Sequence, residues 1–279
     1  MDIRKLTPTF GAEVTGVDLS QPLSDGMFGM IEMLWHKYSM LVFKDQTLSD
    51  TRQVEFGRMF VPPERKGDGY VRFVTNLKKD GKPIGIFPEG ELQFHSDRCS
   101  YADPAIGTIL FAQKVPKVGG NTRFIDCYGA LEMLPKTMQS WLMVKTITNS
   151  YDYETTDNIN VRADNIATEL TAHSYSHPMV RMHPKTKRNA LYVNRLMTAK
   201  IDNMDIEESD RLLNLLFTHL ENTPSIMYDH KWTVGDLVIW DNRCMLHGRT
   251  DFDPLEERLL RKFTLAGEDV LPGRASNVF

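Results

Sequence analysis

The chain has 279 residues, of which 41% are hydrophobic and 10% aromatic, enough for a sizeable core in one large domain or two small ones. Its formal net charge of −4 gives no electrostatic reason to expect a nucleic acid or an acidic membrane as a partner. The N-terminus lacks the apolar core of a signal peptide, and no apolar run approaches the roughly 18 residues that cross a bilayer.

The three cysteines, Cys99, Cys127 and Cys244, are an odd number without a CxxC spacing. This pattern argues against a disulfide framework and against a thiolate zinc site, and it favours small buried side chains in a reducing compartment. We therefore expect a cytoplasmic protein that binds neither nucleic acid nor a membrane.

The first sixty residues mix helices and short strands. Apolar residues at helical spacing predict a helix over 26–39, and a buried strand follows within 39–46. A second helix is predicted over 48–60, with Ser49 or Asp50 as its N-cap.

Residues 61–91 are polar, rich in glycine and proline, and long for a loop in a compact domain. We interpret this stretch as an active-site lid or a variable loop. No repeat or linker divides the chain, so the sequence predicts a single domain over 1–279.

After this stretch the chain consists of short apolar runs separated by turn residues, which is typical of strands. One amphipathic helix, over 207–222, interrupts them. Many short strands with few helices predict a mainly β fold with decorating helices, built as a sandwich or barrel. The predicted strands lie within 91–97, 106–115, 121–127, 143–149, 177–183, 189–195, 225–232, 236–242 and 258–267.

A histidine and a carboxylate stand two residues apart in the first of these strands. His95 and Asp97 would point to the same face, which fits either a surface hydrogen-bonded pair or half of a metal site. His247 follows an apolar strand and a polar corner. If the fold brings His247 to the pair, two imidazoles and one carboxylate suit Fe(II) and leave positions open for a cosubstrate and O2.

Arg258 lies eleven residues after His247, where one more strand would return it to the metal. A buried guanidinium binds a carboxylate through two parallel hydrogen bonds, so an arginine beside an open iron site suits a 2-oxo acid cosubstrate. A solvent-facing charge is the alternative interpretation for Arg258.

Several segments, in order, resemble the taurine dioxygenase and dichlorophenoxyacetate dioxygenase (TauD/TfdA) family of Fe(II)- and 2-oxoglutarate-dependent oxygenases. The resemblance implies a double-stranded β-helix (jelly roll) and carries the iron ligands onto His95, Asp97 and His247. It carries the 2-oxoglutarate contacts onto Thr122 and Arg258. Relatives in this family commonly form dimers or tetramers, so a homo-oligomer is expected. The segments are FGAEVTGVDLSQPL, MLVFKDQTLSD, FHSDRCSYADPAIGTILFAQKVPKVGGNTRFIDCYGALEMLP, HPMVRMHPKTKRNALYVN and VGDLVIWDNRCMLHGR…RLLRKFTL.

The resemblance weakens where the substrate would be chosen. Four residues beyond Arg258, relatives that oxidise sulfonates or aryloxy acids use an arginine to hold the substrate anion, whereas this chain has Lys262 with Arg261 beside it. Both keep the positive charge and favour a small anion, although pairing with acidic residues of 251–257 is the alternative. The stretch 61–91 also matches the family poorly.

The expected reaction is hydroxylation of a C–H bond in a small, anionic organic substrate such as an aryloxyalkanoate, a sulfonate or another carboxylate. 2-Oxoglutarate and O2 would be consumed with release of succinate and CO2, and a carbon–heteroatom bond would break where the hydroxylated carbon bears a leaving group. Two alternatives remain open: a zinc or manganese hydrolase with the same two histidines and aspartate, and a non-enzymatic jelly-roll binding protein.

Overall fold

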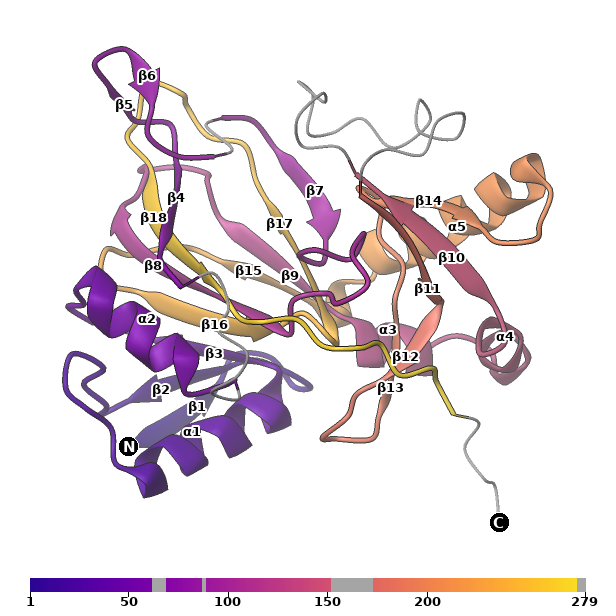
Figure 1. Cartoon of the computed structure of the whole chain (residues 1–279), viewed down its shortest axis with the longest axis horizontal. Helices are drawn as coiled ribbons and strands as arrows, with labels where there is room; N and C mark the ends of the chain where they lie inside the picture. The colour runs from indigo at the N-terminus through magenta and orange to yellow at the C-terminus, as the bar shows by residue number, and fades with distance from the viewer. Residues whose placement is uncertain (62–68, 87–88, 152–172, 275–279) are drawn as a thin grey trace.

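The structure, a computed structural model, describes residues 1–61, 69–86, 89–151 and 173–274. Two sheets dominate the described residues (Figure 1). In spatial order, the seven-stranded sheet consists of β1 (Asp2–Lys5), β2 (Ala12–Thr15), β3 (Met40–Phe43), β16 (Leu237–Asp241), β8 (Gly107–Lys114), β18 (Leu259–Thr264) and β4 (Arg72–Thr75). The four-stranded sheet consists of β15 (Met227–His230), β9 (Thr122–Asp126), β17 (Met245–Arg249) and β7 (Leu92–His95).

The two sheets share one hydrophobic core. Leu110 and Trp240 from the seven-stranded sheet belong to the same buried cluster as Phe94 and Phe124 from the four-stranded sheet. The rings of Phe124 and Trp240 meet edge to face, with centroids 5.3 Å apart. Mostly antiparallel strands that are covered on the core side explain the short, apolar runs of the sequence.

Two helices cover the other face of the seven-stranded sheet, where a second buried cluster lies. They are α1 (Asp25–Tyr38), which begins at the N-cap Ser24, and α2 (Asp50–Arg58), in which the side chain of Ser49 accepts a hydrogen bond from the amide of Arg52. Both helices were predicted, and Ser49 is the N-cap of the two candidates. Because the sheet is covered on both faces, its central strands are apolar on both.

The remaining elements lie beyond one end of the two sheets (Figure 1). The predicted third long helix, α5, is present and begins after the N-cap Asp205, whose carboxylate accepts from two backbone amides. These elements are α3 (Cys127–Glu132), α4 (Lys136–Leu142), β10 (Thr146–Ser150), β11 (Ser174–Pro178), β12 (Val180–Met182), β13 (Asn189–Leu191), β14 (Thr198–Ile201), α5 (Ile206–Glu221) and the 3-10 turn Pro224–Ile226.

The stretch 61–91 differs from the loop that its composition suggests. It contains the edge strand β4 and a small hairpin of β5 (Lys78–Lys79) and β6 (Lys82–Pro83). Residues 62–68 and 87–88 of the predicted lid lie outside the described residues. The strand β4 was missed because its pairing with β18 is long-range, and neighbouring glycines and lysines hide its alternation.

The mainly β architecture with added helices is the expected fold class. Strands β1, β14 and β17, most of β11, and the short helices α3 and α4 were not predicted. Within the described residues, no helix combines the length and apolar character that a membrane span requires.

Candidate active site

Two neighbouring strands bring the predicted histidines together. Strand β17 pairs with β7 in antiparallel fashion, and His247 is the direct register partner of His95. Partners across such a pair point to the same face, so the two imidazole rings lie with their centroids 4.1 Å apart. Asp97 follows just beyond β7, and its Oδ1 lies 3.8 Å from His95 Nε2 and 3.9 Å from His247 Nε2.

These three side chains offer one ligand atom each within 4.8 Å of one another, the one such group found among the described residues. All three are buried, with exposed fractions of 3% for His95, 5% for Asp97 and 7% for His247. The Nδ1 atom of His95 lies 2.9 Å from the carbonyl oxygen of Gln93, which fixes the ring and leaves Nε2 facing the group.

The protonation states suit a cation. Burial lowers the pKa of His95 and holds that of His247 well below its ordinary value, although the charge of Asp97 opposes both effects. Burial alone would raise the pKa of Asp97, but Lys262, His247 and His95 together hold it well below its usual range. At neutral pH the group therefore presents two neutral imidazoles and one carboxylate, a ligand set that Fe(II) accepts.

Arg258 lies directly before β18 and is 2% exposed. Its Nε donates to the carbonyl oxygen of Gly120 at 3.1 Å, whereas its Nη1 has no hydrogen-bond partner among the described residues. Burial, and then the charge of Arg249, lowers the pKa of Arg258 to about 9. A buried guanidinium with an open donor, and with no carboxylate partner in the described part of the chain, has the chemistry to hold an anion.

A glycine allows this approach. Gly120 has a positive φ of 64°, and a Cβ there would come within 3.1 Å of Arg258 Nε and 2.8 Å of Pro116 Cγ. The turn before β9 therefore needs glycine for both backbone conformation and space.

Thr122 begins β9 and lines the same pocket as Arg258. Its Oγ1 accepts a hydrogen bond from Trp232 Nε1 at 3.0 Å. An indole nitrogen can only donate, so this contact occupies the acceptor side of the hydroxyl and leaves its hydrogen free to donate to an anion. The sequence analysis missed Trp232. It lies 110 residues from Thr122, and nothing in the residues around it indicates this contact.

Lys262 and Arg261 separate to opposite faces of β18, as alternation requires. Lys262 lines the pocket, and its Nζ lies 2.8 Å from Asp97 Oδ1. Arg261 donates to the carboxylate of Asp50 and to the carbonyl oxygen of Leu48, on the α2 side of the sheet. The structure therefore places Lys262 in the pocket and Arg261 outside it. We do not propose Arg261 as a substrate contact.

The pocket lies between the two sheets and contains a further cation that the sequence did not suggest. Arg249, two residues after His247 on β17, lines it and is 4% exposed. Its Nε and Nη2 donate to the carbonyl oxygen of Gly90, at 3.0 and 2.7 Å, and Nη2 also donates to that of Glu89. Arg249 stands two residues after His247, so on a strand both side chains point to the same face. The sequence analysis did not predict strand β17 and therefore did not find Arg249. The lining residues are Val74, Leu92, His95, Leu110, Thr122, Trp240, His247, Gly248, Arg249, Arg258 and Lys262.

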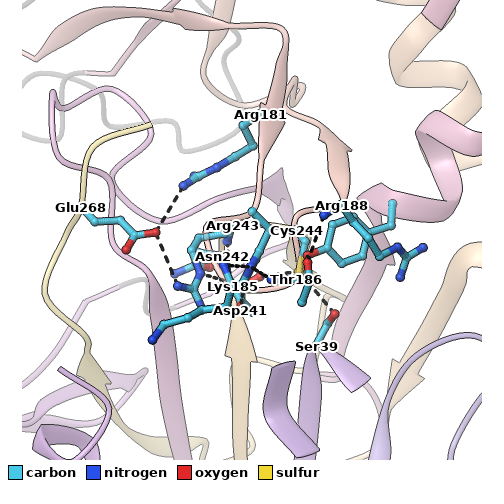
Figure 2. Close-up of polar contacts among 12 residues, drawn as sticks. Ser39, Arg181, Lys185, Thr186, Arg188, Asp241, Asn242, Arg243, Cys244 and Glu268 are labelled. Atoms are coloured by element: carbon cyan, nitrogen blue, oxygen red, sulfur yellow. Dashed lines mark hydrogen bonds and ion pairs between the residues drawn. The ribbon is translucent and has the colours of Figure 1, made fainter. Parts of the chain in front are cut away.

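Charged side chains hold the polar corner after β16 (Figure 2). Arg243 donates twice to Asp241, at 2.8 and 2.7 Å, and its Nη1 lies 3.4 Å from Glu268. His183 contacts the same Asp241 carboxylate at 2.9 Å. These buried pairs fix the backbone of the corner and so the place of Asn242 within it.

The comparisons with known proteins agree with this geometry. The family model described as "Taurine catabolism dioxygenase TauD, TfdA family" matches residues 2–264. A (S)-phenoxypropionate/alpha-ketoglutarate-dioxygenase of Sphingobium herbicidovorans is 31% identical over 96% of this chain and 95% of its own length. An alpha-ketoglutarate-dependent 2,4-dichlorophenoxyacetate dioxygenase of Cupriavidus pinatubonensis is 29% identical over 95% of this chain and 98% of its own.

Solved structures of similar proteins have the same fold. The crystal structure of AAD-2 in complex with Mn(II) and N-oxalylglycine is 31% identical, with a TM-score of 0.83 over 98% of this chain and 100% of that one. A taurine dioxygenase from Burkholderia xenovorans is 25% identical, with a TM-score of 0.80 over 98% and 94% of the two chains.

Proposed function

This chain belongs to the TauD/TfdA family and is a 2-oxoglutarate-dependent dioxygenase, and from that premise we propose that it uses Fe(II) to hydroxylate a C–H bond of a small organic anion. The observation that carries the proposal is the buried group of His95, Asp97 and His247 beside a guanidinium with an open donor. Iron bound here would supply the oxidation chemistry, with 2-oxoglutarate and O2 consumed and succinate and CO2 released.

We propose His95, Asp97 and His247 as the metal ligands. Two neutral imidazoles and one ionised carboxylate need to lose no proton to bind a divalent cation at neutral pH. Oxygen and nitrogen ligands without thiolate favour a metal that keeps open positions for a cosubstrate. The relative AAD-2 was crystallised with Mn(II), a cation of similar preference.

We propose that Thr122 and Arg258 hold the distal carboxylate of 2-oxoglutarate. Arg258 Nη1 would gain the anionic partner that it lacks within the described residues, and the Thr122 hydroxyl is oriented to donate by Trp232. A carboxylate between these donors would offset the cost of burying Arg258, which is why the site favours this anion over a neutral ligand.

We propose Lys262 as the contact for the substrate anion. It faces the pocket from β18, opposite the strands that carry the metal ligands. An ammonium is a point charge on a flexible stem, so it selects for negative charge with less geometric demand than an arginine would. Relatives named for phenoxypropionate and 2,4-dichlorophenoxyacetate support an aryloxyalkanoate, with a sulfonate or another carboxylate as the neighbouring possibilities.

The arrangement of the two sheets supports the finer description of the fold as a double-stranded β-helix, with a seven-stranded and a four-stranded sheet enclosing the site. The family match over residues 2–264 likewise supports one dioxygenase domain. An assembly of two or four copies stays a prediction.

The test is oxygen consumption that requires both added Fe(II) and 2-oxoglutarate, with succinate measured and with phenoxypropionates, other aryloxyalkanoates and alkyl sulfonates offered in turn. We expect His95→Ala to abolish succinate formation and to lose the binding of Mn(II). The matched control is His219→Ala, which removes an imidazole that contacts a backbone carbonyl outside the pocket and should retain both. Wild-type protein that binds no metal, or that consumes no oxygen with any of these anions, would contradict the proposal.

A further inference from the structure

A chain of hydrogen bonds runs from the seven-stranded sheet to the far oxygen of Asp97. Thr108 donates through Oγ1 to Asp97 Oδ2, Asn242 Nδ2 donates to Thr108 Oγ1 at 3.1 Å, and Trp240 Nε1 donates to Asn242 Oδ1 at 2.8 Å. All four side chains are at most 5% exposed. Of these four side chains, only Asp97 has a role in the function proposed above.

The direction of this chain is fixed by its first member. An indole nitrogen can only donate, so the Trp240 contact turns the carbonyl of the Asn242 amide toward the indole and its NH2 toward Thr108. The Asn242 NH2 then fills the acceptor side of the Thr108 hydroxyl, whose single hydrogen points to Asp97. Each side chain therefore donates to the next, and the Asp97 carboxylate accepts the last of these hydrogen bonds.

The strand arrangement fixes the positions of the side chains in this chain of hydrogen bonds. Thr108 on β8 is the register partner of Trp240 on β16, so their side chains share the face toward the pocket. Asn242 stands two residues after Trp240, at the corner where Arg243 donates to Asp241 (Figure 2). The Ser96 hydroxyl, next to Asp97 in sequence, also donates to the carbonyl oxygen of Asn242 at 2.9 Å.

We infer that Trp240, Asn242 and Thr108 are positioning residues that hold Asp97 so that it offers one oxygen to the metal. The hydrogen bond from Thr108 occupies Oδ2, while Oδ1 faces the two imidazoles and also accepts a hydrogen bond from Lys262 at 2.8 Å. A carboxylate free to turn would present both oxygens and take a position that the cosubstrate needs. The inference rests on the proposed role of Asp97 as a metal ligand.

The indole of Trp240 has a second contact that fits the same role. Its ring lies against that of His247, with centroids 4.6 Å apart. One residue thus packs against a proposed imidazole ligand with its ring and, through Asn242 and Thr108, orients the proposed carboxylate ligand with its N–H. This explains in physical terms why tryptophan and asparagine stand two residues apart at the end of β16.

The experiment measures the affinity for Mn(II) alone, from the resonance of free aqueous Mn(II), in metal-free protein without 2-oxoglutarate. Thr108→Val removes the hydroxyl at constant volume and should weaken Mn(II) binding about 10- to 100-fold. Thr108→Ser keeps the hydroxyl and should stay within about threefold of wild type. Thr198→Val is the matched control, because Thr198 is equally buried and donates to Asn149, and neither residue lines the pocket, so its loss should leave Mn(II) affinity unchanged.

A second variant tests the donor-to-acceptor direction of these hydrogen bonds. Asn242→Asp places an acceptor where the amide donates, so the Thr108 hydrogen is drawn away from Asp97 and Mn(II) binding should weaken. In the Thr108→Val background the same change should have no further effect, because it acts through the hydroxyl. Equal Mn(II) affinity in Thr108→Val and wild type, or additive effects of the two changes, would overturn the inference. Wild-type protein that binds no Mn(II) would instead refute the proposed metal site.

Discussion

Arg258 is the residue whose replacement should separate function from stability most clearly. Burial, with the charge of Arg249, lowers its pKa from 12.5 to about 9. At about 1.4 kcal/mol for each pKa unit, this shift corresponds to a free-energy cost on the order of 5 kcal/mol for burying the charged guanidinium. The surrounding residues do not compensate this cost. Arg258→Gln removes that charge, so the ligand-free protein should melt at the same temperature as wild type or higher.

The same substitution should damage the binding of 2-oxoglutarate. Loss of a charged donor to a buried carboxylate costs about 2–4 kcal/mol, which is about a 30- to 1000-fold rise in the KM for 2-oxoglutarate. The affinity for Mn(II) should stay within about threefold, because Arg258 is not among the proposed ligands.

Arg261, three residues along and equally buried, is the matched control. Its guanidinium contacts Asp50 and the carbonyl oxygen of Leu48, and stacks over the ring of Phe111. Arg261→Gln should therefore lower stability by about 1–3 kcal/mol, or several degrees in melting temperature, and leave the KM for 2-oxoglutarate unchanged.

The assay is succinate formation against 2-oxoglutarate concentration, beside thermal unfolding of the metal-free proteins. If Arg258→Gln lowers the melting temperature as Arg261→Gln does, and leaves the KM within threefold of wild type, then Arg258 is a structural cation and its assignment here is wrong.

Two further predictions follow from the charges around Asp97. Lys262→Met should raise the KM of the anionic substrate about 30-fold while leaving the KM for 2-oxoglutarate and the affinity for Mn(II) undiminished; equal KM values for wild type and variant would remove Lys262 from the substrate site. Because burial lowers the pKa values of His95 and His247 below 6.5 in the folded protein, Mn(II) binding at pH 6.5 should release fewer protons than the roughly one that two ordinary imidazoles would release. Calorimetry in two buffers of different ionisation enthalpy measures this number. The unfolded chain binds more protons as the pH falls below 6.5, so the stability that these neutral imidazoles contribute is present above pH 6.5 and is lost as the pH falls further.

The sequence predicted the local parts of the site and could not supply the long-range ones. Alternation along one strand placed His95 and Asp97 on one face, but the register that sets His247 opposite His95 belongs to the pairing of β17 with β7. The stretch 258–267 was predicted as a strand, yet both faces of the sheet are buried, so alternation alone did not tell which of Arg261 and Lys262 faces the pocket. Hydrogen-bond partners such as Trp232 and Thr122 meet only once β9 is placed.

The charges that line the pocket also argue for the class of substrate. Arg249, Arg258 and Lys262 bring three positive charges, and Asp97 is the one carboxylate among the proposed site residues, so a surplus of two remains. The dianion 2-oxoglutarate offsets that surplus, and a divalent metal then adds two positive charges. A buried site with this excess stabilises an anionic substrate and disfavours a cationic one. Of the three cations, Lys262 alone has no backbone carbonyl contact within the described residues and no proposed cosubstrate to hold. Its one hydrogen bond there is with Asp97 Oδ1, and for that reason the substrate anion is assigned to it.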